Sequence, residues 1–390
     1  MDLILLHTII MKRFMIFYFC VSLLHVCHIH GEIFSSVYKL SIISKEEGKL
    51  LSAFNKYIST QARDQKPISF ELQRLLNDLE PIVTESSQDP RYAEHPINAF
   101  HLIGRFVYKW PVVYSSILCE DCTLDGPASD LNATYQIVTR NIAHWPDEYD
   151  VQASAQALLR LRTFYYFNID EAINGVLFDE HCQPLNPSQV LKIVSIAKDS
   201  SMLNEARLWS EALLRRLPFT SYLDENVNEA SILKVLSSIY EQAGLYHKAS
   251  AILGNFIKDD NKEHSEVLNA NEQNDINEEE EADISFVSEE YDDNYKQLCR
   301  ENRKEKPSWG PISEDEPDDL KGTGDRIATW LFYLNDVKVG GATVFPNINT
   351  RIPVIQGGAA FWYNLLPSGV TDNRTMHAGC PVVIGSKWGE

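Results

Sequence analysis

The sequence is poor in basic residues. It has 35 Lys and Arg against 55 Asp and Glu, which gives a formal net charge of −20 at pH 7. Because binding to phosphate needs clustered Lys and Arg, nucleic acid is excluded as a class of partner. Part of the acidic excess lies in residues 259–293, which include an unbroken run of glutamates from Glu278 to Glu281 and are predicted to form a solvated linker.

Long hydrophobic runs are missing from most of the chain. After residue 31 no apolar stretch approaches the length of a membrane-spanning helix. The apolar run of residues 15–26 is short for a span, follows the basic pair Lys12-Arg13 and precedes the small residue Gly31. This order is typical of a secretory signal peptide, so residues 1–31 are predicted to be a signal and the mature chain to be soluble in the secretory pathway.

Cysteine is sparse as well. Beyond the predicted signal the chain holds Cys119, Cys122, Cys182, Cys299 and Cys380. In an oxidising compartment these are disulfide candidates, and the odd number leaves one of them unpaired. The spacing of Cys119 and Cys122 also occurs in zinc sites, but no second such pair or nearby histidine cluster is present, which favours a disulfide.

Two Asn-x-Thr sequons fit the same compartment. They begin at Asn132 and Asn373 and predict N-glycosylation at these two side chains.

The composition that remains is globular, with 44% hydrophobic and 11% aromatic residues. Residues 32–180 carry apolar side chains at helical spacing, interrupted near Pro67 and at residues 88–90. The stripes comprise Leu50, Leu51, Phe54, Tyr57 and Ile58, then Leu72, Leu75, Leu76, Leu79 and Ile82, then Phe100, Ile103, Phe106, Val107 and Trp110. The region is predicted to be a helical bundle, and the pattern leaves open whether these faces pack within the chain or against a second subunit.

Residues 186–258 have the rhythm of two helical hairpins. Pro187 and Ser188 mark a helix start, and Gly244 marks a turn between the last two helices. Short helices with small residues at their crossings favour tetratricopeptide-like packing, which commonly offers a concave face to a peptide. One or two hairpins are equally compatible with plain core.

The character of the chain changes after residue 326. Residues that are β-branched or aromatic predict strands at 326–335, 342–345, 359–365 and 381–384, with a turn at Gly340-Gly341. This is the pattern of an antiparallel sandwich or jelly roll.

Five motifs lie close together between about residues 316 and 388. They are residues 326–335 (RIATWLFYLN), 340–346 (GGATVFP), 361–364 (FWYN), 377–382 (HAGCPV) and 385–388 (GSKW). The set resembles the catalytic domain of collagen-type prolyl 4-hydroxylase alpha subunits, and a match of this density is more specific than any single short motif.

The resemblance extends upstream. Residues 95–100 (HPINAF) resemble a motif of the family's N-terminal dimerisation region, and residues 295–300 (YKQLCR) resemble the start of its catalytic region. The resemblance implies an α+β multidomain chain. Its parts are a helical dimerisation domain at 32–180, a tetratricopeptide-like peptide-binding domain at 186–258, and a partial dioxygenase domain at 294–390 with a double-stranded β-helix, or jelly roll.

The resemblance also implies a chemistry. Members of this family hold Fe(II) with two histidines and one carboxylate, and they bind 2-oxoglutarate through a basic residue. They hydroxylate peptidyl proline at C4 with oxygen, and L-ascorbate rescues the iron. In this sequence His377 matches the distal iron ligand and Lys387 matches the 2-oxoglutarate lysine.

The other two iron ligands have no counterpart. No histidine occurs between His264 and His377, so the His-x-Asp pair of the family is absent. Roughly a hundred family residues are missing between Arg300 and Asp315, judged against ordinary domain size. A clean gap beside intact motifs suggests a skipped exon or a truncated gene model, and the chain as printed is expected to be inactive.

Two structural expectations follow from this gap. Four or five strands cannot close a jelly roll, so Trp330, Phe332 and Phe361 are expected to lack covering partners. The disulfide partners that the resemblance implies for Cys299 and Cys380 are expected in the missing segments.

The resemblance further implies a peptide groove lined with tyrosines, because flat rings stack on polyproline II ligands. Tyr240 and Tyr246 are the candidates for binding a proline-rich or collagen-like peptide. The residues around them carry few aromatics, which favours weak binding or a preference for non-collagen peptides.

The implied partners are protein disulfide isomerase as a β subunit and a second alpha subunit, in the lumen of the endoplasmic reticulum. The absence of a Lys-Asp-Glu-Leu-like ending fits retention through such a partner. Three functions stay open: a hydroxylase alpha subunit, a non-enzymatic secretory-pathway peptide-binding or assembly protein, and a plain helical-repeat interaction protein. The third does not account for the density of motifs after residue 326.

Overall fold

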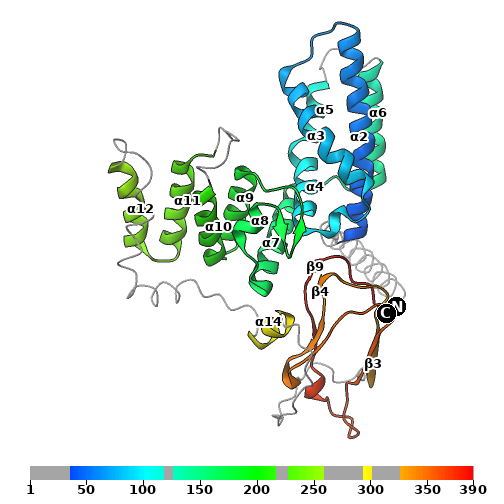
Figure 1. Cartoon of the computed structure of the whole chain (residues 1–390), viewed down its shortest axis with the longest axis vertical. Helices are drawn as coiled ribbons and strands as arrows, with labels where there is room; N and C mark the ends of the chain where they lie inside the picture. Colours follow the sequence, from blue (N-terminus) through cyan, green and yellow to red (C-terminus); the bar gives the residue numbers. More distant parts are fainter. Residues whose placement is uncertain (1–35, 118–125, 217–226, 259–292, 301–325, 390) are drawn as a thin grey trace, which may run out of the picture.

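The computed structural model describes residues 36–117, 126–216, 227–258, 293–300 and 326–389 (Figure 1). The predicted signal peptide, the Cys119 and Cys122 pair and nearly all of the predicted acidic linker lie outside these ranges. Helices dominate up to residue 258 and small antiparallel sheets dominate after residue 326, so the predicted α+β class is confirmed. No helix within the described ranges combines the length and apolarity needed to cross a lipid bilayer.

The N-terminal part is a group of helices whose starts are set by polar caps. Ser36 and Ser69 accept hydrogen bonds from backbone N–H groups of the first turns that follow them, and Asp147 forms a reciprocal capping box with Asp150. The elements are α2 (Val37–Arg63), α3 (Phe70–Gln88), the 3-10 turn η2 (Tyr92–Glu94), α4 (Pro96–Tyr108), α5 (Trp110–Ile117), α6 (Pro127–Ile142), α7 (Glu148–Tyr165) and α8 (Ile169–Ile173), followed by the hairpin of β1 (Val176–Leu177) and β2 (Glu180–His181). The predicted interruptions near Pro67 and at residues 88–90 are confirmed, whereas the stripe predicted through Trp110 is divided between α4 and α5.

A buried ion pair lies inside this helical group. The Glu47 carboxylate of α2 is fully buried and accepts two hydrogen bonds of 2.8 Å from the Arg105 guanidinium of α4. Trp110 donates to the same carboxylate at 2.9 Å, and Arg105 also donates to the hydroxyls of Tyr92 and Ser86. The network therefore joins α2, α3, η2, α4 and α5. Because its polar groups are buried, water cannot form the hydrogen bond that a lost partner would leave unmade.

The next four helices continue the same apolar core and extend away from the first group in a row (Figure 1). They are α9 (Pro187–Asp199), α10 (Leu203–Arg216), α11 (Glu229–Gln242) and α12 (Tyr246–Lys258). Asn186 caps α9 in a capping box with Gln189, and Pro187 occupies the first helical position, as the sequence predicts. Gly244 forms the predicted turn between α11 and α12 with a φ of +79°, a left-handed conformation that favours glycine.

The C-terminal part consists of short strands in three small antiparallel sheets. The strands are β3 (Ala328–Phe332), β4 (Val339–Gly340), β5 (Thr343–Phe345), β6 (Thr350–Ile352), β7 (Ala359–Tyr363), β8 (Ala378–Gly379) and β9 (Val382–Ile384), with 3-10 turns η5 (Pro346–Ile348) and η6 (Asn373–Thr375). β3 pairs with β7, β4 pairs with β9, and β5 lies between β6 and β8. The four predicted strands are present in shortened form. β6 and β8 are not predicted, because strands of two or three residues are too short to show alternation.

One turn prediction needs correction. Gly340 is the last residue of β4 and sits at an irregularity in the pairing with β9, while Gly341 follows the strand. Both glycines have positive φ, so the chain does change direction here, but half of the predicted turn is hydrogen-bonded sheet.

The β part is docked on the helices. Val383 and Ile384 of β9 belong to the same apolar cluster as the helical core. The backbone N–H of Gly385 donates to the Glu94 carbonyl at 3.2 Å, and Lys338 pairs with Glu180 of the β1–β2 hairpin. The short helix α14 (Asp293–Arg300) lies beside both α7 and β5.

Replacement of Glu47 by Gln is expected to lower the free energy of unfolding by about 3–5 kcal/mol, because it leaves the Arg105 charge buried without its counterion. Chemical denaturation of the two proteins measures this. The matched control is Lys56→Met, which breaks the exposed pair with Asp130 and should cost less than about 1 kcal/mol. Equal costs for the two variants would show that the Glu47 pair is solvated.

Stability is also expected to fall as the pH drops from about 6.5 towards 4. Burial lowers the pKa of His95 and of His101 to about 4, so the unfolded chain binds these protons first and folding is penalised in that window. The loss approaches about 3 kcal/mol for each buried imidazole. Denaturation measured at several pH values should show a smaller slope for His101→Gln, whereas His181→Gln, at an exposed position, should keep the full slope.

Candidate functional site

The two larger sheets turn their inner faces toward each other. Along β7 the burial alternates, so Ala360 and Trp362 lie inside while Phe361 and Tyr363 lie outside. Just past β3, Tyr333 is buried, and its hydroxyl donates to Thr343 Oγ1 of β5 at 2.9 Å. This hydrogen bond joins the β3–β7 sheet to the β6–β5–β8 sheet.

His377 lies at the start of β8, opposite Phe345. The register pairs Val344 of β5 with Ala378 of β8. Because the two strands are antiparallel, His377, which precedes Ala378, lies beside Phe345, which follows Val344. Its ring centroid is 5.6 Å from that of Phe345 and 4.6 Å from that of Trp362. Nδ1 lies 2.8 Å from the Thr375 carbonyl, which can only accept, so Nδ1 carries the proton and Nε2 keeps its lone pair. This is the tautomer that a metal-ligating histidine uses with Nε2.

Lys387 reaches the same inner face from beyond β9. Its ammonium donates to the Gly341 carbonyl at 2.7 Å and lies 3.4 Å from Thr343 Oγ1 and 5.5 Å from the centre of the Tyr333 ring. Burial lowers the pKa of Lys387. Within the part of the chain that the structure describes, no carboxylate lies within ion-pair distance of this ammonium, so the site holds a half-buried positive charge surrounded by neutral groups. Such a charge is suited to a carboxylate ligand.

The two groups share one face of β5. Thr343 and Phe345 are two residues apart, so their side chains point to the same side about 7 Å apart along the strand. Lys387 approaches Thr343 and His377 approaches Phe345, so the ammonium and the imidazole lie along one edge of a single inner surface. The arrangement places a cation suited to a small anion at one end and an imidazole Nε2 lone pair at the other.

The metal end is incomplete. A non-haem iron site of this type needs two histidines and a carboxylate, and His377 is the one matching ligand. Among the described residues, three potential ligands come together at His144, Asp147 and Asp150, next to the start of α7, and not at His377. Both of these aspartates already cap α7, which explains their closeness. The residues present around His377 therefore do not fit the iron set.

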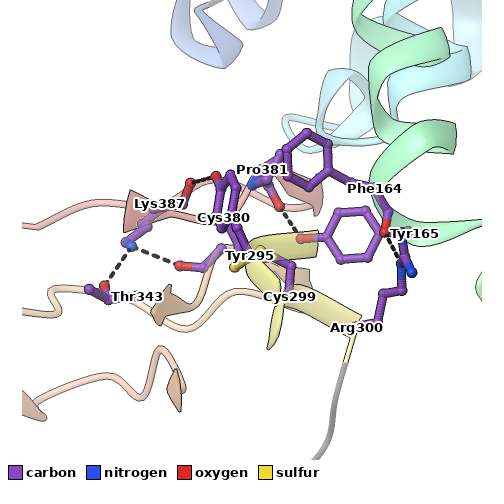
Figure 2. The surroundings of a disulfide bond; sticks show 11 residues. Phe164, Tyr165, Tyr295, Cys299, Arg300, Thr343, Cys380, Pro381 and Lys387 are labelled. Atoms are coloured by element: carbon purple, nitrogen blue, oxygen red, sulfur yellow. Dashed lines mark hydrogen bonds between the residues drawn. A yellow bond between two sulfur atoms is a disulfide. The ribbon is translucent and has the colours of Figure 1, made fainter. Parts of the chain in front are cut away.

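The cysteine expectations need a correction. Cys299 of α14 and Cys380, directly after β8, form a disulfide with each other across 81 residues of sequence (Figure 2). Their Cα atoms lie 5.6 Å apart because α14 packs against the end of β8, so neither thiol needs a partner from a further segment. Cys182 is free, and burial raises the pKa of its thiol to about 12.

The lack of cover predicted for three aromatic side chains is confirmed. Trp330, Phe332 and Phe361 are 60%, 43% and 52% exposed on the outer face of the β3–β7 sheet. Their rings contact one another, with Trp330 stacked on Phe332 and edge-on to Phe361. Their contacts to each other replace only part of the cover that a larger sheet or helix layer gives.

The remaining predicted residues lie away from this face. Tyr240 is half-buried on α11, where burial raises its pKa to about 12, and Tyr246 is exposed at the start of α12. Asn132 lies within α6 and accepts a hydrogen bond from Tyr114, and Asn373 begins η6. Peptide binding and glycosylation at these positions stay predictions.

Sequence reasoning missed Tyr333, Thr343 and Trp362. All three stand inside the quoted motifs, and alternation along each strand could have marked them as inward-facing. Their contacts with Lys387 and His377 depend on how the sheets face each other, which alternation does not report.

Comparisons with known proteins point to the same family that the sequence resembles. A family model described as "Prolyl 4-Hydroxylase alpha-subunit, N-terminal region" matches residues 36–179. Over 77 residues the chain is 58% identical to prolyl 4-hydroxylase subunit alpha-1 of Gallus gallus, which is 19% of this chain and 15% of that protein. It is 54% identical to subunit alpha-1 of Homo sapiens over 84 residues (21% and 16%), and 55% identical to subunit alpha-2 of Gallus gallus over 69 residues (18% and 13%). Each aligned segment thus spans between 13% and 16% of its relative.

Replacement of Thr343 by Val is expected to lower the free energy of unfolding by about 1–3 kcal/mol, because the buried Tyr333 hydroxyl loses its acceptor. Urea denaturation measures the effect. Thr139→Val removes a hydroxyl that bonds only to a carbonyl of its own helix and serves as the matched control, with an expected change under about 1 kcal/mol. A cost at Thr343 no larger than the control would mean that the Tyr333 hydroxyl is satisfied by water.

Proposed function

Because the chain belongs to the family of prolyl 4-hydroxylase alpha subunits, we propose that its C-terminal β part binds 2-oxoglutarate through Lys387, Thr343 and Tyr333. Lys387 would pair with the distal carboxylate, while the Thr343 hydroxyl, held by Tyr333, adds a hydrogen bond. The proposal rests on one observation, which is the half-buried Lys387 ammonium with neutral partners and no counterion among the described residues.

The chain's role in hydroxylation is the second part of the proposal. When bound, Fe(II), oxygen and 2-oxoglutarate supply the oxidising power for C4 of peptidyl proline, and L-ascorbate keeps the iron reduced. His377 offers Nε2 as one iron ligand and Trp362 packs against its ring. A second histidine and a carboxylate would be needed to complete the set of iron ligands.

The wider assignment follows the same family. The helical part at residues 32–180 would associate with a second alpha subunit, and protein disulfide isomerase would serve as the β subunit in the endoplasmic reticulum lumen. The helices at residues 186–258 would be a tetratricopeptide-like domain that binds a proline-rich or collagen-like peptide near Tyr240 and Tyr246. The small sheets would be part of a jelly roll, with N-glycans at Asn132 and Asn373.

A second candidate function is a non-enzymatic peptide-binding or assembly factor of the secretory pathway. The observation that favours it is the lone His377, which has no partner ligands among the described residues. Succinate release coupled to a proline-containing peptide separates the two functions, because it requires a complete iron set. Sequencing of full-length transcripts between the codons of Cys299 and Asp318 shows whether a segment encoding His-x-Asp belongs there.

Isothermal titration with 2-oxoglutarate tests the cofactor site directly. Lys387→Met is expected to weaken binding at least about tenfold, because a charge-assisted hydrogen bond contributes roughly 1.5–3 kcal/mol. When the pH is raised, the affinity for 2-oxoglutarate should begin to decline at a lower pH than it would at an exposed lysine. The reason is that burial lowers the pKa of Lys387, so its positive charge is lost earlier.

The matched control is Lys338→Met, which removes an exposed lysine that pairs with Glu180 outside the site. Its affinity for 2-oxoglutarate should stay within about twofold of the unmodified chain. Binding that is absent in the unmodified chain, or equal losses for both variants, would overturn the assignment.

A further inference from the structure

The stretch of chain between His377 and Lys387 is held from the helical side at three consecutive residues (Figure 2). The hydroxyl of Tyr295 donates to the Gly379 carbonyl at 2.7 Å, Cys299 forms a disulfide with Cys380, and the hydroxyl of Tyr165 donates to the Pro381 carbonyl at 2.6 Å. The hydrogen bond of Tyr295 and the disulfide of Cys299 come from α14, and the hydrogen bond of Tyr165 comes from the end of α7.

Further hydrogen bonds connect the Pro381 carbonyl to the Lys387 ammonium. The same Pro381 carbonyl accepts the backbone N–H of Gly341 at 3.0 Å, and the Gly341 carbonyl accepts the Lys387 ammonium at 2.7 Å. Tyr165 thus lies at one end of a chain of hydrogen bonds whose other end is the proposed carboxylate-binding group. Because Tyr165 and the Gly341 N–H share the Pro381 carbonyl oxygen, a shift of that carbonyl would also move Gly341, whose own carbonyl accepts the Lys387 ammonium.

The contact between Tyr165 and Pro381 is tightly packed against Gly340. A Cβ placed on Gly340 would lie 2.4 Å from the Pro381 carbonyl oxygen and 2.8 Å from the Tyr165 hydroxyl oxygen. Both distances are shorter than real side chains tolerate, so the bare backbone of Gly340 lets the tyrosine hydroxyl reach the strand. The tyrosine therefore packs directly against the β4 end that precedes Gly341.

The C-terminal end of α7, which carries Tyr165, is bound by Arg300 of α14. Arg300, next to the disulfide residue Cys299, donates to the carbonyls of Thr163 and Phe164 at the C-terminal end of α7. Its guanidinium also lies 3.6 Å from the centre of the Tyr166 ring. Because α14 closes the last carbonyls of α7, the helix end that carries Tyr165 has the same anchor as the disulfide.

We propose that Tyr165 and Tyr295 are positioning residues that set the Lys387 ammonium and the His377 imidazole relative to each other through residues 379–381. The inference extends the proposed 2-oxoglutarate site and rests on it for the ligand. It assigns the helical part of the chain a role in the affinity of a site that lies entirely on the β part. Neither tyrosine touches the ligand, so each acts through the strand that it holds.

The test uses the full chain with Tyr165→Phe, which removes one hydroxyl and keeps the ring. Titration with 2-oxoglutarate is expected to show affinity weakened roughly three- to tenfold, the range for loss of one positioning hydrogen bond. A readout without ligand is the 15N signal of the Lys387 ammonium, assigned with Lys387→Arg, which should shift when the Gly341 carbonyl moves. Tyr166→Phe is the matched control, since its exposed ring contacts Arg300 and it should change neither measurement.

Tyr295→Phe is the second variant, and it keeps the test decisive if Tyr165→Phe does not fold. It should weaken the affinity in the same direction and shift the His377 ring signals, because it frees the Gly379 carbonyl. A lower melting temperature with an unchanged Lys387 signal and unchanged affinity would show a purely structural role and overturn the inference. A shifted Lys387 signal in a chain that does not bind 2-oxoglutarate would support positioning and refute the proposed ligand.

Discussion

The anchoring of residues 379–381 to two helices is the constraint on which the C-terminal part of this molecule depends. Its strands are two to five residues long, and sheets of this size bury too little surface to be stable alone. One of their apolar clusters is shared with the helices, since Phe164 of α7 and Leu298 of α14 pack with Val344 and the disulfide. The disulfide and the two tyrosine hydroxyls therefore replace part of the core that a closed β barrel would supply.

Arg105 is a buried cation and Lys387 is a partly buried one, and their charges are compensated differently. Arg105 is fully enclosed and meets a carboxylate, an indole-linked network and two hydroxyls, so its charge is compensated and its role is to join helices. Lys387 is partly buried, and its partners are a carbonyl and a hydroxyl that carry no net charge. Burial disfavours the charged form of Lys387, and a bound carboxylate would relieve that cost, which supports the proposed role of Lys387 in binding a ligand.

The β part is packed on one face and exposed on the other. Its inner face carries the buried Tyr333 and Trp362, with His377 beside Trp362, and its outer face leaves Trp330 and Phe361 in solvent. Under the proposed assignment, one further segment carrying His-x-Asp would supply the remaining iron ligands and cover part of the outer face.

Through a family resemblance the sequence singled out His377 and Lys387, whose roles stay predictions. By itself it also determined the helix interruptions near Pro67 and at residues 88–90, the helix start at Pro187, the turn at Gly244 and the strands rich in β-branched residues. These features are local, since a cap, a turn or an alternating strand is set by neighbours a few residues away. The tertiary structure decided the pairing of Cys299 with Cys380, the division of the stripe at Trp110, and the meeting of Tyr165 with Pro381. Such contacts join residues up to 216 positions apart, and no local pattern records which distant surfaces pack together.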